Sequence, residues 1–228
     1  MSYLYRCIAQ RPGSVCIALI LALASVQGQA LELLIRDQHG QPVENAIVTV
    51  VGGSQAKAEP QLRIMDQVNR AFLPHVLLIN AGDQVEFPNS DNIRHHVYSF
   101  SEPKVFEIKL YADRPKAPLS FGTPGVVVLG CNIHDTMLGY IYVSPTPHAA
   151  MSDNEGRVSV PVPDGYEGLT VWHEFYALSE TEVLEITVAE VQSSPKQDGT
   201  AQITIELLPP APVEQAPPET GFGNSMRR

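Results

Sequence analysis

The chain has 228 residues, of which 44% are hydrophobic and 18% charged, with 15 basic and 25 acidic side chains. Its formal net charge of −10 argues against a nucleic-acid or anionic-lipid partner, because both are polyanions. Nineteen prolines and sixteen glycines favour a β-rich protein with many turns over a helical bundle.

Residues 1–30 are organised like a secretory signal. Arg6 and Arg11 form a positive region, an apolar run follows at 15–24, and Gly28-Gln29-Ala30 offers the small residues of a cleavage site. The apolar run is shorter than the about 20 residues that a membrane helix needs. We expect cleavage after Ala30, a periplasmic location and no stable membrane insertion, with an uncleaved anchor as the alternative.

Cleavage changes the cysteine count and the charge. Cys7 and Cys16 leave with the signal, so Cys131 is the one thiol that remains and no intramolecular disulfide is possible. A lone thiol in an oxidising compartment is a liability unless it is buried or bound to a metal. Two of the 15 basic residues and none of the 25 acidic ones are lost, which makes the mature net charge −12 and favours a basic patch on a protein partner.

Short strands are expected along most of the mature chain. The first two lie at 31–35 and 46–51, on either side of the turn Asp37-Gln38-His39-Gly40. Eight more extended runs follow without a helical period, at 62–65, 73–79, 84–87, 94–100, 105–110, 117–121, 126–131 and 138–143. This spacing predicts a Greek-key sandwich or barrel.

A further group of strands is expected after Pro145, at 158–162, 169–172, 183–188 and 202–207, the last two as a closing pair. The turn Asp153-Asn154-Glu155-Gly156 repeats the pattern of residues 37–40. Residues 209–228 are Pro-rich and lack apolar periodicity, which predicts disorder.

Residues 31–53 supply only two strands, which is too few to bury a core. With residues 146–208 they resemble the small sandwich called the carboxypeptidase regulatory-like domain, through Asp37-x-x-Gly40-x-Pro42, Asp153-x-x-Gly156 and Pro163-x-Gly165-Tyr166. We therefore predict an insertion, with three successive units as the alternative. The predicted parts are a signal at 1–30, the first strands of this second sandwich at 31–59, an inserted domain at 60–145, the rest of the second sandwich at 146–208 and a disordered tail at 209–228.

Metal-binding side chains gather in the predicted inserted domain. Cys131, His134 and Met137 occur as Cys-x-x-His-x-x-Met after an apolar strand, and the pair His95-His96 lies upstream. One thiolate, two imidazoles and a thioether form the ligand set of a mononuclear electron-transfer copper site. The spacing puts three of these ligands on one tight loop.

Other uses of these residues fit less well. A dinuclear copper centre needs two cysteines on the loop, a c-type haem needs Cys-x-x-Cys-His, and methionine is a poor zinc ligand. A cysteine nucleophile with His134 as its base would leave Met137 unexplained. Structural or solvated roles are expected for the remaining histidines, which are His39, His75, His148 and His173.

The same region resembles the cupredoxins. It contains Gly82-Asp83-x-Val85-x-Phe87-x-Asn89, then His95-His96-Val97 and the Cys131 motif, a pattern similar to that of amicyanin and pseudoazurin. Most of residues 31–175 are also similar to bacterial proteins labelled methylamine utilization protein or plastocyanin-like. The resemblance implies an all-β fold, with a Greek-key cupredoxin sandwich inserted in or joined to a second, Ig/transthyretin-like sandwich.

The resemblance also implies one mononuclear type-1 copper ion, with the four ligands His95, Cys131, His134 and Met137. The cupredoxin motif selects His95 over His96, which stands where the relatives usually carry Asn or Ser and could donate a hydrogen bond to the site instead. His134 is implied to be the ligand nearest to solvent. The residues around it, Ile133, Thr136 and Leu138, are then candidates for a contact patch.

The function implied is periplasmic transfer of single electrons without catalysis. A c-type cytochrome or a periplasmic oxidoreductase is the expected transient partner. The alternative is a periplasmic copper-binding or copper-delivery protein, with His96 as an auxiliary ligand. A third hypothesis places function in the second sandwich, where Trp172 and Tyr176 could stack on a sugar, although such residues on a strand are more often core.

Overall fold

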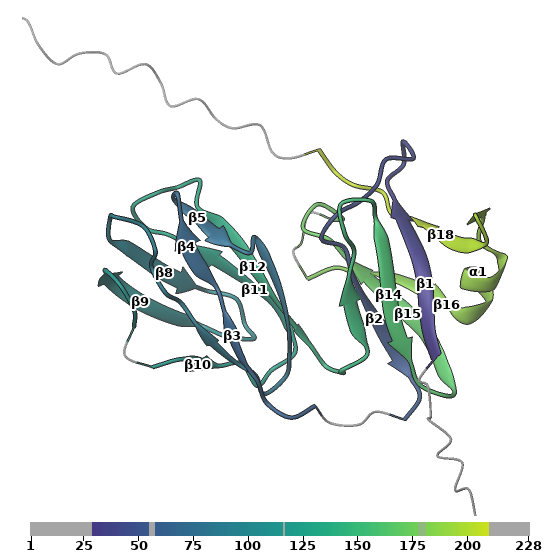
Figure 1. The fold of residues 1–228 in the computed structure, drawn as a ribbon, viewed down its shortest axis with the longest axis horizontal. Helices are drawn as coiled ribbons and strands as arrows, with labels where there is room; N and C mark the ends of the chain where they lie inside the picture. Colours follow the sequence, from purple (N-terminus) through teal and green to yellow (C-terminus); the bar gives the residue numbers. More distant parts are fainter. Residues whose placement is uncertain (1–28, 55–57, 116, 178, 180, 210–228) are drawn as a thin grey trace, which may run out of the picture.

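The structure is a computed structural model that describes residues 29–54, 58–115, 117–177, 179 and 181–209 (Figure 1). These residues form 18 strands and one short helix, so the all-β prediction is confirmed. None of the helices in this part of the chain is long and apolar enough to cross a bilayer. The predicted signal lies outside the described residues except for Gln29 and Ala30, which begin the first strand, and the predicted tail lies outside them except for Pro209.

Residues 62–144 form a sandwich that we call the central sandwich. Its larger sheet has the order β6-β12-β11-β8-β9, and its smaller sheet has the order β10-β7-β3. The larger sheet consists of β6 (Val76–Asn80), β12 (Leu138–Ser144), β11 (Gly125–Gly130), β8 (His95–Ser99) and β9 (Phe106–Tyr111). The smaller consists of β10 (Leu119–Ser120), β7 (Gln84–Glu86) and β3 (Leu62–Ile64). A separate hairpin is made by β4 (Asp66–Val68) and β5 (Ala71–Leu73).

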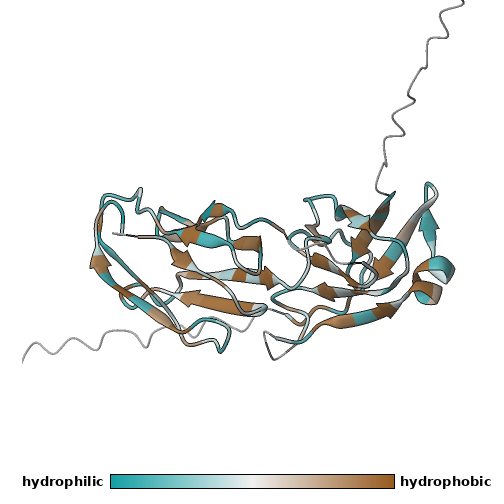
Figure 2. Ribbon diagram, turned by 90° about the horizontal axis from the view of Figure 1, so that it is seen from below, coloured by the Kyte–Doolittle hydropathy of each residue, from teal (hydrophilic) through white to brown (hydrophobic). Residues whose placement is uncertain are grey.

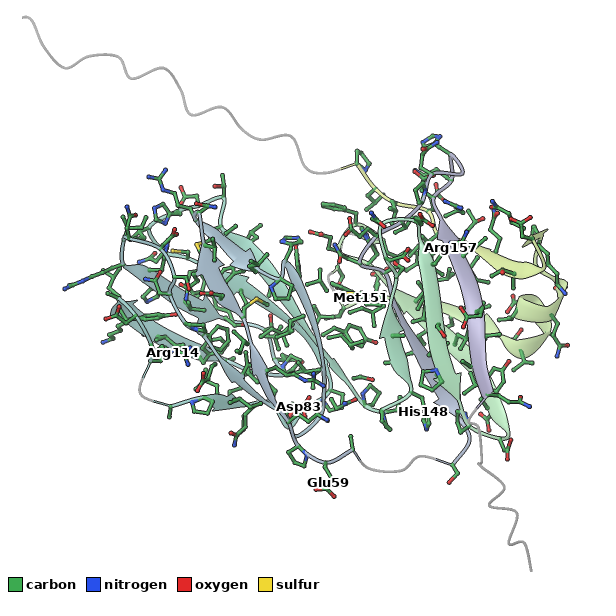
Figure 3. All side chains as sticks on the ribbon, in the orientation of Figure 1. Glu59, Asp83, Arg114, His148, Met151 and Arg157 are labelled. Carbon is green, nitrogen blue, oxygen red and sulfur yellow. The ribbon has the colours of Figure 1, made fainter. Side chains whose placement is uncertain are left out.

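The apolar faces of the central sandwich meet in one core that includes Phe87, Val97, Leu129 and Ile141. Asp83 of the Gly-Asp motif is buried at one end of this sandwich, near the connection that carries Glu59 (Figure 3). Its carboxylate accepts the backbone N–H groups of Gln61 and Asn80, at 2.7 and 3.0 Å. This part of the motif therefore serves the fold and takes no part in the candidate metal site.

The strands on either side in the sequence share two further sheets, which we call the flanking sandwich. One sheet has the order β14-β1-β18-β17 and the other the order β13-β2-β15-β16. The first consists of β14 (Arg157–Val162), β1 (Gln29–Arg36), β18 (Thr200–Thr204) and β17 (Lys196–Gln197). The second consists of β13 (Ala149–Met151), β2 (Ile47–Gly52), β15 (Tyr166–Trp172) and β16 (Leu184–Thr187). Strands β1 and β2 thus pair with strands that begin at residue 149 or later. The domain boundaries given above stay predictions.

The expected closing pair of strands at 183–188 and 202–207 is wrong. Strand β16 pairs with β15 and strand β18 pairs with β1, so the two lie in different sheets. Helix α1 (Val188–Ser193) connects these sheets, and it begins with a capping box in which Thr187 and Glu190 satisfy each other's backbone N–H groups. Six residues are too few to reveal a helical period in the sequence.

The two sandwiches lie side by side, and apolar residues recur along the strands of both (Figures 1 and 2). A third apolar cluster lies between them, with Tyr140 and Tyr142 from the central sandwich and Ile47 and Trp172 from the flanking one. Trp172 has no exposed surface. The prediction that Trp172 is core is therefore confirmed, and its ring is not available to stack on a sugar.

The repeated Asp-x-x-Gly turns share one geometry. In each, the glycine N–H donates to the aspartate carbonyl, at 3.0 Å for Gly40 and 2.9 Å for Gly156. Both glycines have a left-handed backbone, with φ of +76° and +73°. Their surroundings differ, because a Cβ on Gly156 would lie 2.4 Å from the carbonyl oxygen of Ile35, whereas nothing lies within 4 Å of one on Gly40.

Gly40→Ala and Gly156→Ala should therefore differ in stability. Gly40→Ala is expected to lower the free energy of unfolding by about 1 to 2 kcal/mol, the usual cost of a left-handed alanine. Gly156→Ala adds a backbone collision and should cost clearly more. Urea unfolding of the two variants measures this difference, and equal midpoints would contradict it.

Candidate metal centre

The candidate ligands come from two elements of the central sandwich. His95 is the first residue of β8, and Cys131, His134 and Met137 lie on the connection between β11 and β12. Strands β8 and β11 are hydrogen-bonded neighbours in the larger sheet, which brings segments separated by 36 residues together. The order of strands therefore sets the first histidine beside the cysteine loop.

Two consecutive turns bring the loop ligands together. The N–H of His134 donates to the carbonyl oxygen of Cys131 at 3.4 Å, and the N–H of Met137 donates to that of His134 at 2.9 Å. Each bond joins one candidate ligand to the next, three residues later. The Cys-x-x-His-x-x-Met spacing is thus the spacing of two linked turns.

Three donor atoms converge at this end of the sandwich. Cys131 Sγ lies 3.8 Å from His95 Nδ1 and 3.7 Å from His134 Nδ1. The donor atoms of all three residues lie within 4.8 Å of one another, and no other such group of His, Cys, Asp and Glu occurs in the described part of the chain. A metal ion about 2.0 Å from nitrogen and about 2.3 Å from sulfur lies in a plane of three donors when N and S are about 3.8 Å apart. Both sulfur–nitrogen separations therefore match those expected around one metal ion.

Met137 lies in the same core as Cys131. Its exposed fraction is 1%, and both residues belong to the apolar cluster of the central sandwich. A buried thioether beside a thiolate and two imidazoles matches the soft donor set that copper electron-transfer sites use. Met137 is therefore a candidate for the fourth ligand.

The two adjacent histidines point to different places. The His95 ring is fully buried and faces Cys131 with Nδ1, whereas His96 Nε2 lies 2.9 Å from the carboxylate of Glu107 on β9. The contacts of the two rings separate them, because the His96 ring lies beside Tyr98 and Glu107 while the His95 ring lies beside Cys131. His95 is therefore the candidate ligand, and the hydrogen bond expected from His96 to the site goes to Glu107 instead.

Asp91 holds the far side of the His95 ring, a role that the sequence did not reveal. His95 Nε2 donates to Asp91 Oδ2 at 2.7 Å, which leaves Nδ1 as the unprotonated nitrogen that faces Cys131. The same carboxylate accepts the backbone N–H groups of Asn69 and Arg70, each at 2.8 Å. These two residues form the tip of the β4–β5 hairpin, so Asp91 connects a candidate ligand to a surface turn.

The hydrogen bonds around Asp91 favour the ionised form of its carboxyl group. Burial raises the pKa of its carboxyl, but the bonds from Arg70, His95 and Asn69 outweigh burial and lower the pKa below its usual value. Asp91 is therefore a carboxylate at neutral pH and acts only as an acceptor. That charge favours the tautomer of His95 with the proton on Nε2.

Solvent reaches the site through the loop. His134 is partly exposed, whereas His95 and Cys131 are buried. Ile133 and Leu138, on either side of His134, have exposed fractions of 46% and 47%. The most accessible candidate donor is therefore His134, and two exposed apolar side chains lie on the same loop.

The other histidines lie away from this group. His39 is exposed in its turn, and His148 is partly buried in a connection. His75 bonds to Glu174, which raises the pKa of His75, while burial lowers the pKa of His173. None of these side chains joins the donor group, which is consistent with the structural or solvated roles expected for them.

Comparison with protein-family models gives no match, and comparison with curated proteins gives none. Among solved structures, the copper-containing nitrite reductase from Thermus scotoductus SA-01 is 28% identical with a TM-score of 0.35, over 42% of this chain and 25% of that one. A purple cupredoxin from Nitrosopumilus maritimus is 24% identical with a TM-score of 0.32, over 38% of this chain and 100% of that one. A reduced Cu(I) mutant of amicyanin is 17% identical with a TM-score of 0.33, over 42% of this chain and 98% of that one.

This chain thus spans only a quarter of the length of the nitrite reductase that it matches. All three TM-scores lie below 0.5, so the interpretation of the site rests on the strand order and the donor geometry. On those grounds the central sandwich has a cupredoxin-like fold, and its His-Cys-His group is compatible with one mononuclear copper site.

Asp91→Asn tests the hydrogen bond to His95. Loss of a carboxylate that orients a ligand histidine is expected to weaken metal binding about 10- to 100-fold. Competition between the purified protein and a chelator for copper measures this loss. Asp135→Asn is the matched control, because it removes the same charge from an exposed residue next to His134. Equal affinities of the two variants would contradict a positioning role for Asp91.

Proposed function

We propose that the protein carries single electrons in the periplasm through one type-1 copper ion, with His95, Cys131, His134 and Met137 as ligands. The observation that supports this best is the convergence of Cys131 Sγ with two imidazole Nδ1 atoms, at 3.7 and 3.8 Å. Copper bound by such donors supplies a one-electron couple. The predicted signal and the lone buried thiol support export, since a free cysteine survives oxidation best when it is buried or ligated.

The residues around the donors keep the site in one geometry. His95 is held by a strand on one side and by Asp91 on the other, and the loop ligands are joined by two backbone hydrogen bonds. Side chains locked by packing and by such bonds move little when charge arrives or leaves. Small movement favours fast electron transfer, because little of the surrounding structure has to reorganise.

A carrier role fits this ligand set better than catalysis does. Catalytic metal sites keep an open position for water or substrate, whereas structural and electron-transfer sites are closed by protein ligands. With His95, Cys131, His134 and Met137 as ligands, the side chains of this chain fill the site. We therefore propose that the protein is an electron carrier and not an enzyme.

Copper delivery has less support than electron transfer. That hypothesis used His96 as an auxiliary ligand, but the His96 ring is bonded to Glu107 and does not join the group of His95, Cys131 and His134. Delivery also requires an exchangeable site, whereas three of the four proposed ligands are buried. The electron carrier is therefore the proposal that we retain.

A transient redox partner would meet the loop surface. Ile133 and Leu138 form an apolar surface beside the partly exposed His134, and the acidic chain favours a partner with a basic patch. We propose a c-type cytochrome or a periplasmic oxidoreductase as that partner. Small, weak and salt-sensitive contacts are usual in such encounters.

The visible spectrum of the Cu(II) protein tests the site. We expect an intense blue thiolate-to-copper band, which is lost in Cys131→Ser because the thiolate is the origin of the band. His95→Gln should also abolish it, whereas His96→Gln should retain it, which makes these neighbours a matched pair. A colourless copper adduct of the unchanged protein would contradict the electron-carrier proposal and favour copper storage or delivery.

Ile133→Ser tests the contact surface. The rate of electron transfer to a basic c-type cytochrome should fall about fivefold, the effect of losing roughly 1 kcal/mol at an interface. The rate of the unchanged protein should also fall as salt is added. Val105→Ser removes a similar exposed side chain beyond the far end of the β8–β9 pairing from His95 and should have no effect. Equal rates for the two variants would mean that the contact surface lies elsewhere.

A further inference from the structure

The strand that follows the candidate ligand loop is held on two sides inside the central sandwich, because Leu138 and Gly139 pair with β11 and Tyr140 bonds to the segment before β6. Tyr140, three residues after Met137, donates its backbone N–H to the carbonyl oxygen of His75 at 2.9 Å. Tyr140 also pairs with Val76 in the parallel β6–β12 ladder. The bond between Tyr140 and His75 is therefore one of the contacts that hold the strand directly after Met137.

The flanking sandwich contacts Tyr140 directly. The Trp172 ring lies 5.8 Å from the Tyr140 ring and 5.6 Å from the Tyr142 ring, between centroids. The Tyr142 hydroxyl also lies 3.3 Å from Oγ1 of Thr49 on β2. Trp172 and Ile47 are fully buried in the cluster between the sandwiches, so this contact is dry and packed.

The flanking sandwich contacts His75 as well. Glu174 lies two residues after Trp172, and its carboxylate accepts a hydrogen bond from His75 Nε2 at 2.8 Å. The His75 ring lies edge-on to the Tyr140 ring, with centroids 5.5 Å apart. One short segment, 172–174, thus touches both residues of the bond between Tyr140 and His75.

We propose that Trp172 and Glu174 are positioning residues that hold the Met137 end of the metal loop from the flanking sandwich. Trp172 fixes the Tyr140 ring by packing, and Glu174 fixes the His75 ring by a hydrogen bond. Without them the start of β12 frays, and the turn between His134 and Met137 loosens with it. The proposal gives the flanking sandwich a function in the proposed copper site, on whose existence its copper readout rests.

Amide hydrogen exchange of the metal-free protein is the first test. The Tyr140 amide reports the bond to His75, and the Ile35 amide, bonded to Gly156 at 2.7 Å, reports the core of the flanking sandwich. Trp172→Phe and Glu174→Gln should each speed exchange at Tyr140 several-fold, and Trp172→Ala about tenfold or more, with a smaller change at Ile35. Because no copper is present, this result does not depend on the electron-carrier proposal.

The control variant changes Leu169, which lies on strand β15 like Trp172. Leu169 is buried in the core of the flanking sandwich, so Leu169→Ala destabilises that sandwich without touching Tyr140 or His75. It should speed exchange at Ile35 more than at Tyr140, the reverse of the Trp172 and Glu174 variants. The same pattern in all variants would mean a general loss of stability and would overturn the positioning role.

The second readout is copper release to a chelator. Release should be faster in Trp172→Phe and Glu174→Gln by several-fold, and nearly unchanged in Leu169→Ala below its unfolding transition. Glu174→Gln keeps the size of the side chain and removes one charge, so it remains informative where Trp172→Ala fails to fold. If exchange at Tyr140 and copper release both stay within about twofold of the unchanged protein in Trp172→Phe and Glu174→Gln, the proposal is wrong.

Discussion

The pairing of β8 with β11 is the constraint on which the donor geometry depends. These strands meet with Tyr98 opposite Gly130, the residue directly before Cys131. The Tyr98 ring lies over Gly130 so closely that a Cβ there would be 2.6 Å from the ring carbon Cζ. A larger residue at this position would displace the Tyr98 ring from the strand pair that brings His95 to Cys131.

The cupredoxin-like fold and the donor set follow from local patterns in the sequence. Short apolar runs separated by turns predict the strands, and the Cys-x-x-His-x-x-Met spacing predicts one tight loop, because both signals act over a few residues. The choice of His95 over His96 came from the resemblance, and the contacts of the two rings agree with it. Insertion of the central strands was predicted by a count of strands, since two alone cannot bury a core.

What the sequence could not predict depends on contacts between distant segments. Asp91 is one acidic residue among many until the fold brings it to the His95 ring and the β4–β5 turn. The predicted partner of strand β16 was wrong because a six-residue helix redirects the chain after it. A helix this short leaves no helical period in the sequence. Glu174 likewise acquires a role only through His75, from which it is separated by 99 residues.

Three histidines of this protein bond to a carboxylate through Nε2, yet only one becomes a candidate ligand. In His95, His96 and His75 the carboxylate fixes the ring and leaves Nδ1 to face elsewhere. Nδ1 of His95 faces the cysteine, whereas Nδ1 of His96 is buried without a hydrogen-bond partner among the described residues. For the adjacent His95 and His96, the surroundings into which each ring points decide whether Nδ1 meets the cysteine sulfur. A histidine becomes a candidate metal ligand here because of where its strand places it, and its carboxylate partner only fixes the ring.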